Sequence, residues 1–108
     1  MRPLAWTMVL LLASMAAPAF ADMPQVAIAI KSHRFVPSEV QIPAGTKVEL
    51  LVRNQDATPS EFESTALHRE KIVTAGQQIS VFVGPLQPGR YEFFDDFHPQ
   101  TRGHLVVK

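Results

Sequence analysis

The fold is decided by YEFFDDFHPQTRGHLVVK, which is the stretch Tyr91–Lys108. Apolar and polar residues alternate on both sides of a short segment that contains His98. Such alternation is typical of β-strands with one buried face. The stretch therefore predicts a strand, a tight loop that carries a histidine, and a returning strand.

The same alternation recurs along the rest of the chain after the first twenty-odd residues. It is carried by Val26, Ile28 and Ile30, by Val40 and Ile42, by Val48, Leu50 and Val52, and by Ile79, Val81 and Val83. Turn-forming residues separate these runs, and Pro43–Gly45 is predicted to close a hairpin. Short strands at this spacing predict an all-β domain, either a sandwich or a barrel.

One segment, Asp56–Glu70, lacks the alternation and is rich in polar and charged residues. A loop of this length in a small domain is usually either functional or partly structured. We expect it to enter a short strand near Glu61 and to form one helical turn around residues 66–69.

The N-terminus has the pattern of a secretory signal peptide. A charged start at Arg2 is followed by an apolar run and by the small residues Ala19 and Ala21. This pattern predicts a signal peptide over residues 1–21 and a mature domain over residues 22–108 that is exported to the periplasm. The apolar run is short for a membrane span, so the mature chain is not expected to insert into the membrane.

Composition excludes several classes of function. The whole chain has ten Lys and Arg against ten Asp and Glu; removal of Arg2 with the signal peptide leaves nine against ten, a formal charge of −1. There is no basic stripe of the kind that nucleic-acid binding requires. The chain contains no cysteine, which excludes thiol redox chemistry and a thiolate metal site within it.

The C-terminal stretch resembles the metal-binding loop of the cupredoxins, which has the pattern Tyr-x-Phe-x-Cys-x-x-His-Pro-x-Met-x-Gly-x-Leu-x-Val. His98 matches the histidine, whereas Asp95 stands at the cysteine position and Thr101 at the methionine position. Further resemblance covers Phe35–Gly45, Val48–Asp56 and Gly84–Phe93. The resemblance implies a cupredoxin-like Greek-key β-sandwich, but not blue-copper electron transfer, which needs a thiolate.

A narrower resemblance is carried by His33-x-Phe35-x-Pro37, Glu61–Ser64, Arg69–Lys71 and Phe94–Pro99. These motifs are similar to a cysteine-free cupredoxin-like family of small exported proteins associated with bacterial high-affinity iron permeases. The resemblance implies binding of copper and/or iron and support of ferrous iron uptake. The implied partner is an iron permease or another exported subunit, and the implied reaction is oxidation of Fe(II).

The resemblance also implies a metal at one end of the sandwich, where three segments remote in sequence would converge. His33 lies two residues before Phe35 and is expected on the same face of a strand. The candidate metal ligands are His33, Glu61, Glu63, Asp95, Asp96 and His98. Adjacent strand residues point to opposite faces, so either Asp95 or Asp96 faces the site. Either Ser60 or Glu61 takes the first ligand position. His68 and His104 are expected to face solvent.

Two imidazoles and one or two carboxylates form a nitrogen–oxygen site that suits Cu(II), Fe(II), Fe(III), Zn(II) or Mn(II). Two histidines and one carboxylate on one face are typical of non-haem Fe(II) sites. Two rival interpretations remain open at this point. The protein could be a periplasmic copper carrier or buffer without iron chemistry, or a metal-free interaction module that keeps the cupredoxin frame.

Overall fold

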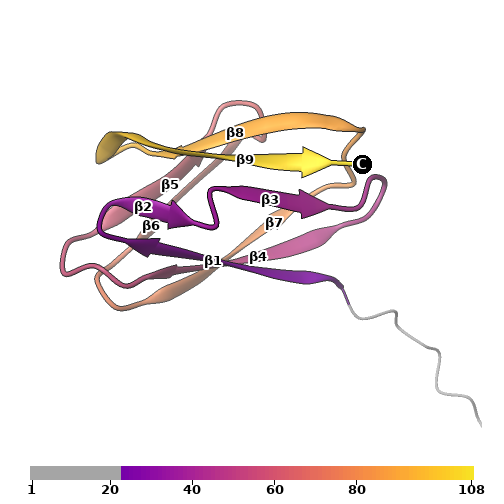
Figure 1. The fold of residues 1–108 in the computed structure, drawn as a ribbon. Helices are drawn as coiled ribbons and strands as arrows, with labels where there is room; N and C mark the ends of the chain where they lie inside the picture. Colours follow the sequence, from indigo (N-terminus) through magenta and orange to yellow (C-terminus); the bar gives the residue numbers. More distant parts are fainter. Residues whose placement is uncertain (1–22) are drawn as a thin grey trace, which may run out of the picture.

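The computed structural model describes residues 23–108, which form a sandwich of two facing β-sheets (Figure 1). The predicted signal peptide lies outside the described residues. Within residues 23–108 no helix is long and apolar enough to cross a membrane. The strands are β1 (Gln25–Lys31), β2 (Arg34–Val36), β3 (Glu39–Ile42), β4 (Val48–Asn54), β5 (Ser60–Ser64), β6 (Arg69–Val73), β7 (Gln78–Val83), β8 (Gly89–Asp95) and β9 (His98–Val107).

One sheet has the strand order β2-β1-β4-β7 and the other has the order β3-β9-β8-β5-β6. The pairs β1–β4 and β3–β9 are parallel, and the remaining pairs are antiparallel. The chain crosses between the sheets after β2, after β3, after β4, after β6 and after β7. The predicted all-β sandwich is confirmed.

The core lies between the sheets and contains most of the residues whose alternation predicted the strands, together with Phe35, Phe62, Leu67 and Val73. Phe93 sits at its centre, with ring centroids 4.8 Å from Phe35 and 5.1 Å from Phe62. Gly103 faces Phe93 across the β8–β9 pair. A Cβ atom at residue 103 would overlap the Phe93 ring and lie 2.8 Å from the Ser38 carbonyl oxygen, so this position requires glycine.

The prediction of a hairpin at Pro43–Gly45 is wrong. β3 pairs with β9, whereas β4 pairs with β1 and β7, so Pro43–Gly45 joins the two sheets. A turn signal marks where a strand ends, but the partner of that strand is chosen by long-range packing.

The irregular segment 56–70 contains the expected short strand, β5, but the predicted helical turn is wrong. Residues 65–68 form a tight turn, with the His68 amide donating to the Thr65 carbonyl at 3.3 Å, and β6 begins at Arg69. β6 is an edge strand whose first four residues are all exposed. It therefore carries no alternation by which its sequence could be recognised as a strand.

Candidate metal centre

The β1–β2 turn and the β8–β9 turn lie at the same end of the sandwich, at the left in Figure 1. The first turn carries His33 and the second is followed at once by His98. The centroids of the two imidazole rings are 4.1 Å apart, and their planes are tilted by 32°. The structure thus brings together the two histidines that the sequence analysis placed in one site.

His33 lies in a turn, whereas the sequence analysis placed it on a strand with Phe35. Ser32 and His33 both have positive φ angles, 52° and 55°, which suits a two-residue hairpin turn but is unfavourable for residues other than glycine. The carboxylate of Asp56 accepts hydrogen bonds from the Ser32 amide at 2.7 Å and the His33 amide at 2.9 Å. Asp56 therefore holds the turn in place.

Asp56 also lies beside the ring of His33, with its Oδ2 3.6 Å from His33 Nδ1, slightly beyond hydrogen-bonding distance. Asp56 is not among the ligands predicted from the sequence, which gives only a weak indication of its role. It follows Asn54 at the end of β4, and the Asn54 side chain accepts a hydrogen bond from the Asp56 amide at 2.9 Å. Short-range capping of this kind is common for Asn and Asp and does not by itself indicate a functional site.

Asp95 is fully buried and holds His98, whose Nδ1 lies 2.9 Å from Asp95 Oδ2. Asp95 Oδ1 accepts hydrogen bonds from the amides of Glu61 and Phe97, each at 3.0 Å. Burial raises the pKa of Asp95. The neighbouring Ser60 hydroxyl, these two amides and His98 stabilise the charged carboxylate and outweigh the effect of burial, so the pKa of Asp95 lies below its usual value. The Ser60 hydroxyl faces the carboxylate without the geometry of a formed hydrogen bond.

Both histidines therefore have a carboxylate beside Nδ1, which leaves Nε2 as the nitrogen for a ligand. A carboxylate on the second ring nitrogen is the usual arrangement for metal-binding histidine, because it fixes the tautomer and makes the other nitrogen a better donor. The two side chains are 49% and 31% exposed. They line an open groove of about 810 Å³ together with Arg34, Phe97 and Pro99.

Thr101 supports the same pair from β9. Its hydroxyl donates a hydrogen bond of 2.5 Å to the carbonyl oxygen of His33. This contact ties the β1–β2 turn to the strand that begins with His98. Thr101 stands where the cupredoxin pattern has methionine, and its hydroxyl is committed to the backbone.

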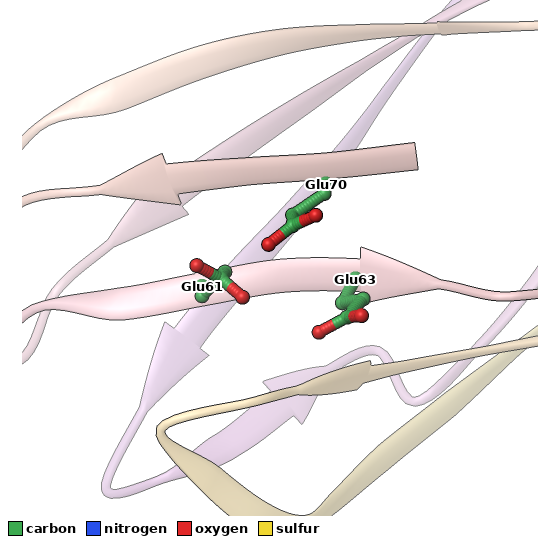
Figure 2. A group of neighbouring side chains, drawn as sticks. All are labelled: Glu61, Glu63 and Glu70. Carbon is green, nitrogen blue, oxygen red and sulfur yellow. The ribbon is translucent and has the colours of Figure 1, made fainter. Parts of the chain in front are cut away.

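Glu61 and Glu63 do not join the histidines, although the sequence analysis grouped all of them. Their side chains project from the outer face of the five-stranded sheet, where Glu70 of β6 lies beside them (Figure 2). The reason is strand alternation: Phe62 between them is fully buried in the core, so its two neighbours must face away from it. Ser60, and not Glu61, points inward next to Asp95.

The adjacent acids Asp95 and Asp96 divide in the same way. Asp95 faces His98, whereas the Asp96 amide donates to the Glu61 carbonyl at 3.0 Å and the Asp96 carboxylate acts on Glu61 and Glu63. The six predicted ligands thus form two groups, one inside and one outside the five-stranded sheet near the β5–β8 pair. One group is His33, Asp95 and His98; the other is Glu61, Glu63 and Asp96, with Glu70 added by the structure.

Burial, and then the negative charges of Glu70, Asp96 and Glu63, raise the pKa of Glu61 from 4.5 to about 7. Burial, and then the negative charges of Asp96 and Glu70, also raise the pKa of Glu63. The folded protein therefore binds more protons than the unfolded chain between these pKa values. The contribution of Glu61 to stability is fully present below pH 4.5 and is lost as the pH rises through about 7.

We expect the metal-free protein to lose stability to urea between about pH 5 and about pH 8, and the Glu61→Gln variant to lose less over this range. The measurement is the urea midpoint at a series of pH values in the presence of a chelator. Glu49→Gln, on the other sheet, is the control and should follow the wild-type profile. An unchanged slope in Glu61→Gln would show that the carboxyl of Glu61 does not titrate in this range.

Comparison with known families gives a match to the cupredoxin-like domain over residues 3–107. The chain belongs to the cupredoxin-like domain family. It is 49% identical over 84 residues to an uncharacterized protein of Rickettsia prowazekii (strain Madrid E), across 77% of this chain and 67% of that relative.

Two solved cupredoxin-like structures are similar in fold. Amicyanin from Paracoccus versutus (Thiobacillus versutus) aligns with a TM-score of 0.64 at 24% identity, over 82% of this chain and 87% of its own. The metal-binding domain of the Cu(I)-exporting P-type ATPase CopA of Streptococcus pneumoniae D39, solved with Cu(I), aligns with a TM-score of 0.68 at 19% identity, over 78% and 84%. These identities are low, so the likeness concerns the fold.

The donors of this cupredoxin-like chain do not fit a blue-copper centre. Asp95 is a hard oxygen donor at the cysteine position, and the Thr101 hydroxyl is already bonded to a backbone carbonyl. Two imidazole nitrogens do fit an ion such as Cu(II), Fe(II) or Fe(III), with water or a ligand oxygen in its remaining positions. His33 and His98 would hold such an ion through Nε2, with Asp95 orienting the His98 ring and Asp56 beside the His33 ring.

Proposed function

We propose that this cupredoxin-like protein works in the periplasm, where it binds copper and/or iron at the His33–His98 pair and supports ferrous iron uptake through a membrane permease. The observation that carries the proposal is the pairing of two imidazole rings at 4.1 Å, each with a carboxylate beside Nδ1. Two turns that are remote in sequence meet to form this arrangement.

The donor set favours particular ions. Imidazole ligands suit Cu(II) and iron, whereas Cu(I) is better served by sulfur ligands, which this pair lacks. By the general order of affinities, Cu(II) binds such a site more tightly than Fe(II) at equilibrium. Bound copper would supply a one-electron redox centre. The protein's own residues fix the rings, and their exposure in an open groove leaves the site accessible to an ion or to a partner.

The role in iron uptake rests on the motifs shared with the permease-associated family. The proposal includes oxidation of Fe(II) to Fe(III) before the iron reaches the permease or another exported subunit. Bound Cu(II) would accept the one electron that each iron loses, and dioxygen would reoxidise the copper. Donors without sulfur do not stabilise Cu(I), which is consistent with this direction of electron transfer.

A second candidate is a periplasmic copper carrier or buffer without iron chemistry. The exposure of both histidine side chains, which leaves a bound ion free to exchange, favours it. A carrier and an iron-oxidising protein make different demands on the same site: the first needs only exchange of copper, whereas the second needs turnover of iron.

Fe(II) loss in air separates the two candidates. We expect the copper-loaded protein to accelerate the disappearance of Fe(II), measured with a ferrous-specific chelating dye, above the rate given by metal-free protein or by the same concentration of Cu(II) alone. The His98→Ala variant should return the rate to that background. Tight copper binding without any acceleration of Fe(II) loss would reject the iron role and favour the carrier.

A further inference from the structure

We infer that Glu61, Glu63 and Glu70 form a second cation site, on the outer face of the five-stranded sheet, for a hard divalent or trivalent metal ion. This site is separate from the histidine pair. It goes beyond the proposed function, because it does not depend on whether His33 and His98 bind metal.

Geometry brings the three carboxylates together. One carboxylate oxygen from each residue lies within 4.8 Å of the other two. Glu63 of β5 stands directly opposite Glu70 of β6, and Glu61 lies two residues earlier on the same face of β5. Figure 2 shows the three side chains gathered over the same short stretch of the two strands. Asp96 adds a fourth negative charge beside Glu61 and Glu63.

Acidic clusters are common on protein surfaces, but this one is unusually buried. Glu61 is only 8% exposed, so its carboxyl group is largely shielded from water. Glu63 Oε2 is buried with no hydrogen-bond partner. Buried carboxylate oxygens almost always have a partner, so an oxygen aimed into the cluster without one indicates a missing cation.

The nearby basic residues do not neutralise the cluster. Arg69 and Lys71 alternate with Glu70 on β6 and therefore project from the opposite face of the strand. Arg69 donates to the Phe82 carbonyl at 2.9 Å, and Lys71 donates to the Ser80 carbonyl at 3.0 Å, so both reach across to β7 of the other sheet. These contacts close the sandwich along this edge.

The outer face also carries Arg90 of β8 and Arg102 of β9. Arg90 pairs with Glu39 at 3.4 Å, and Arg102 is engaged as well. Its guanidinium lies over the Phe94 ring, 5.1 Å from the centroid, and pairs with Glu92. Phe94 stands opposite Glu63 across the β5–β8 pair, so this ring lies between Arg102 and the cluster. The acids are thus left to repel one another unless an ion joins them.

The donors define the class of ligand. Carboxylate oxygens suit hard ions such as Mn(II), Ca(II) and trivalent cations, and offer nothing to Cu(I). Three or four negative charges around one point favour a higher cation charge. The histidine pair, with nitrogen donors, prefers Cu(II). The two sites therefore differ in the ions that they select.

The test uses Tb(III), a luminescent hard trivalent ion, as the probe. We expect the purified protein to bind Tb(III). The double variant Glu61→Gln with Glu63→Gln should bind it at least about 100-fold more weakly, because removing a residue that only supports a metal ligand already lowers affinity roughly 10- to 100-fold. His98→Ala should bind Tb(III) like the wild type, and the double variant should keep its Cu(II) affinity. Glu39→Gln with Glu92→Gln is the matched control for nonspecific binding to surface acids.

Two results would overturn the inference. One is Tb(III) affinity that is equal in the wild type and the double glutamine variant, which would place the ion elsewhere. The other is loss of Tb(III) binding in His98→Ala, which would mean one shared site. If the double variant does not fold, Glu70→Gln at the exposed edge strand gives the same comparison. Failure of Cu(II) binding at the histidines would leave the Tb(III) results unchanged.

Discussion

Removal of either imidazole is expected to weaken Cu(II) binding by about 100-fold or more, since even the loss of a residue that only orients a ligand costs roughly 10- to 100-fold. The variants are His98→Ala and His33→Asn. Asparagine is chosen at residue 33 because the φ angle there is 55° and asparagine tolerates this left-handed conformation. The combined variant should lose tight binding altogether. Affinity is measured by competition with a chelator of known strength.

His104→Ala is the matched control for this prediction. His104 lies on β9 near the surface, with Nε2 3.5 Å from a Glu92 oxygen, and is remote from the β1–β2 turn. It should bind Cu(II) like the wild type. If His33→Asn and His98→Ala fold normally and retain wild-type affinity, the histidine pair is not the copper site, and a metal-free interaction module becomes the better interpretation.

Asp95→Ala is expected to destabilise the protein by about 3 kcal/mol, because it leaves buried hydrogen-bond donors without an acceptor. The lost acceptor serves the amides of Glu61 and Phe97 and the ring of His98. The depressed pKa of Asp95 also makes stability depend on acid pH. The stability that the Asp95 carboxylate contributes is present above pH 3.8, the pKa of the unfolded chain, and is lost as the pH falls through the lower pKa of the folded protein. Urea unfolding at neutral and acid pH measures both effects.

Asp96→Ala provides the control at the neighbouring position. Asp96 is exposed and repels Glu61 and Glu63, so its removal should leave stability unchanged or slightly higher. The contrast between these adjacent acids tests the alternation that separates the histidine pair from the glutamate cluster. Equal destabilisation by the two substitutions would contradict the assignment of Asp95 as the buried support of His98.

The strands were predictable because their chemistry is local. Val48, Leu50 and Val52 alternate with more polar neighbours, and that pattern is sufficient to predict β4. The pairing of β3 with β9 was not predictable from local signals, since it joins residues far apart in sequence. β6 was missed because an exposed edge strand has no buried face. The resemblance to cupredoxins, and not periodicity alone, predicted the sandwich topology.

The candidate site was predictable in part. The shared end of His33 and His98 followed from the resemblance, but the separate place of Glu61 and Glu63 was already implied by Phe62. A core-facing residue between them directs both carboxylates to the outer surface. Asp56 was missed because it acts through hydrogen bonds to amides of a turn that is remote in sequence. Glu70 was missed because its pairing with Glu63 depends on the register of β6.

A crystal of the Cu(II)-loaded protein, measured for anomalous scattering at the copper edge, tests the central claim most directly. We predict an anomalous peak between the two imidazole rings, about 2 Å from a ring nitrogen of His33 and from one of His98. A peak at the outer glutamates alone, or copper bound with neither ring in reach, would contradict the account.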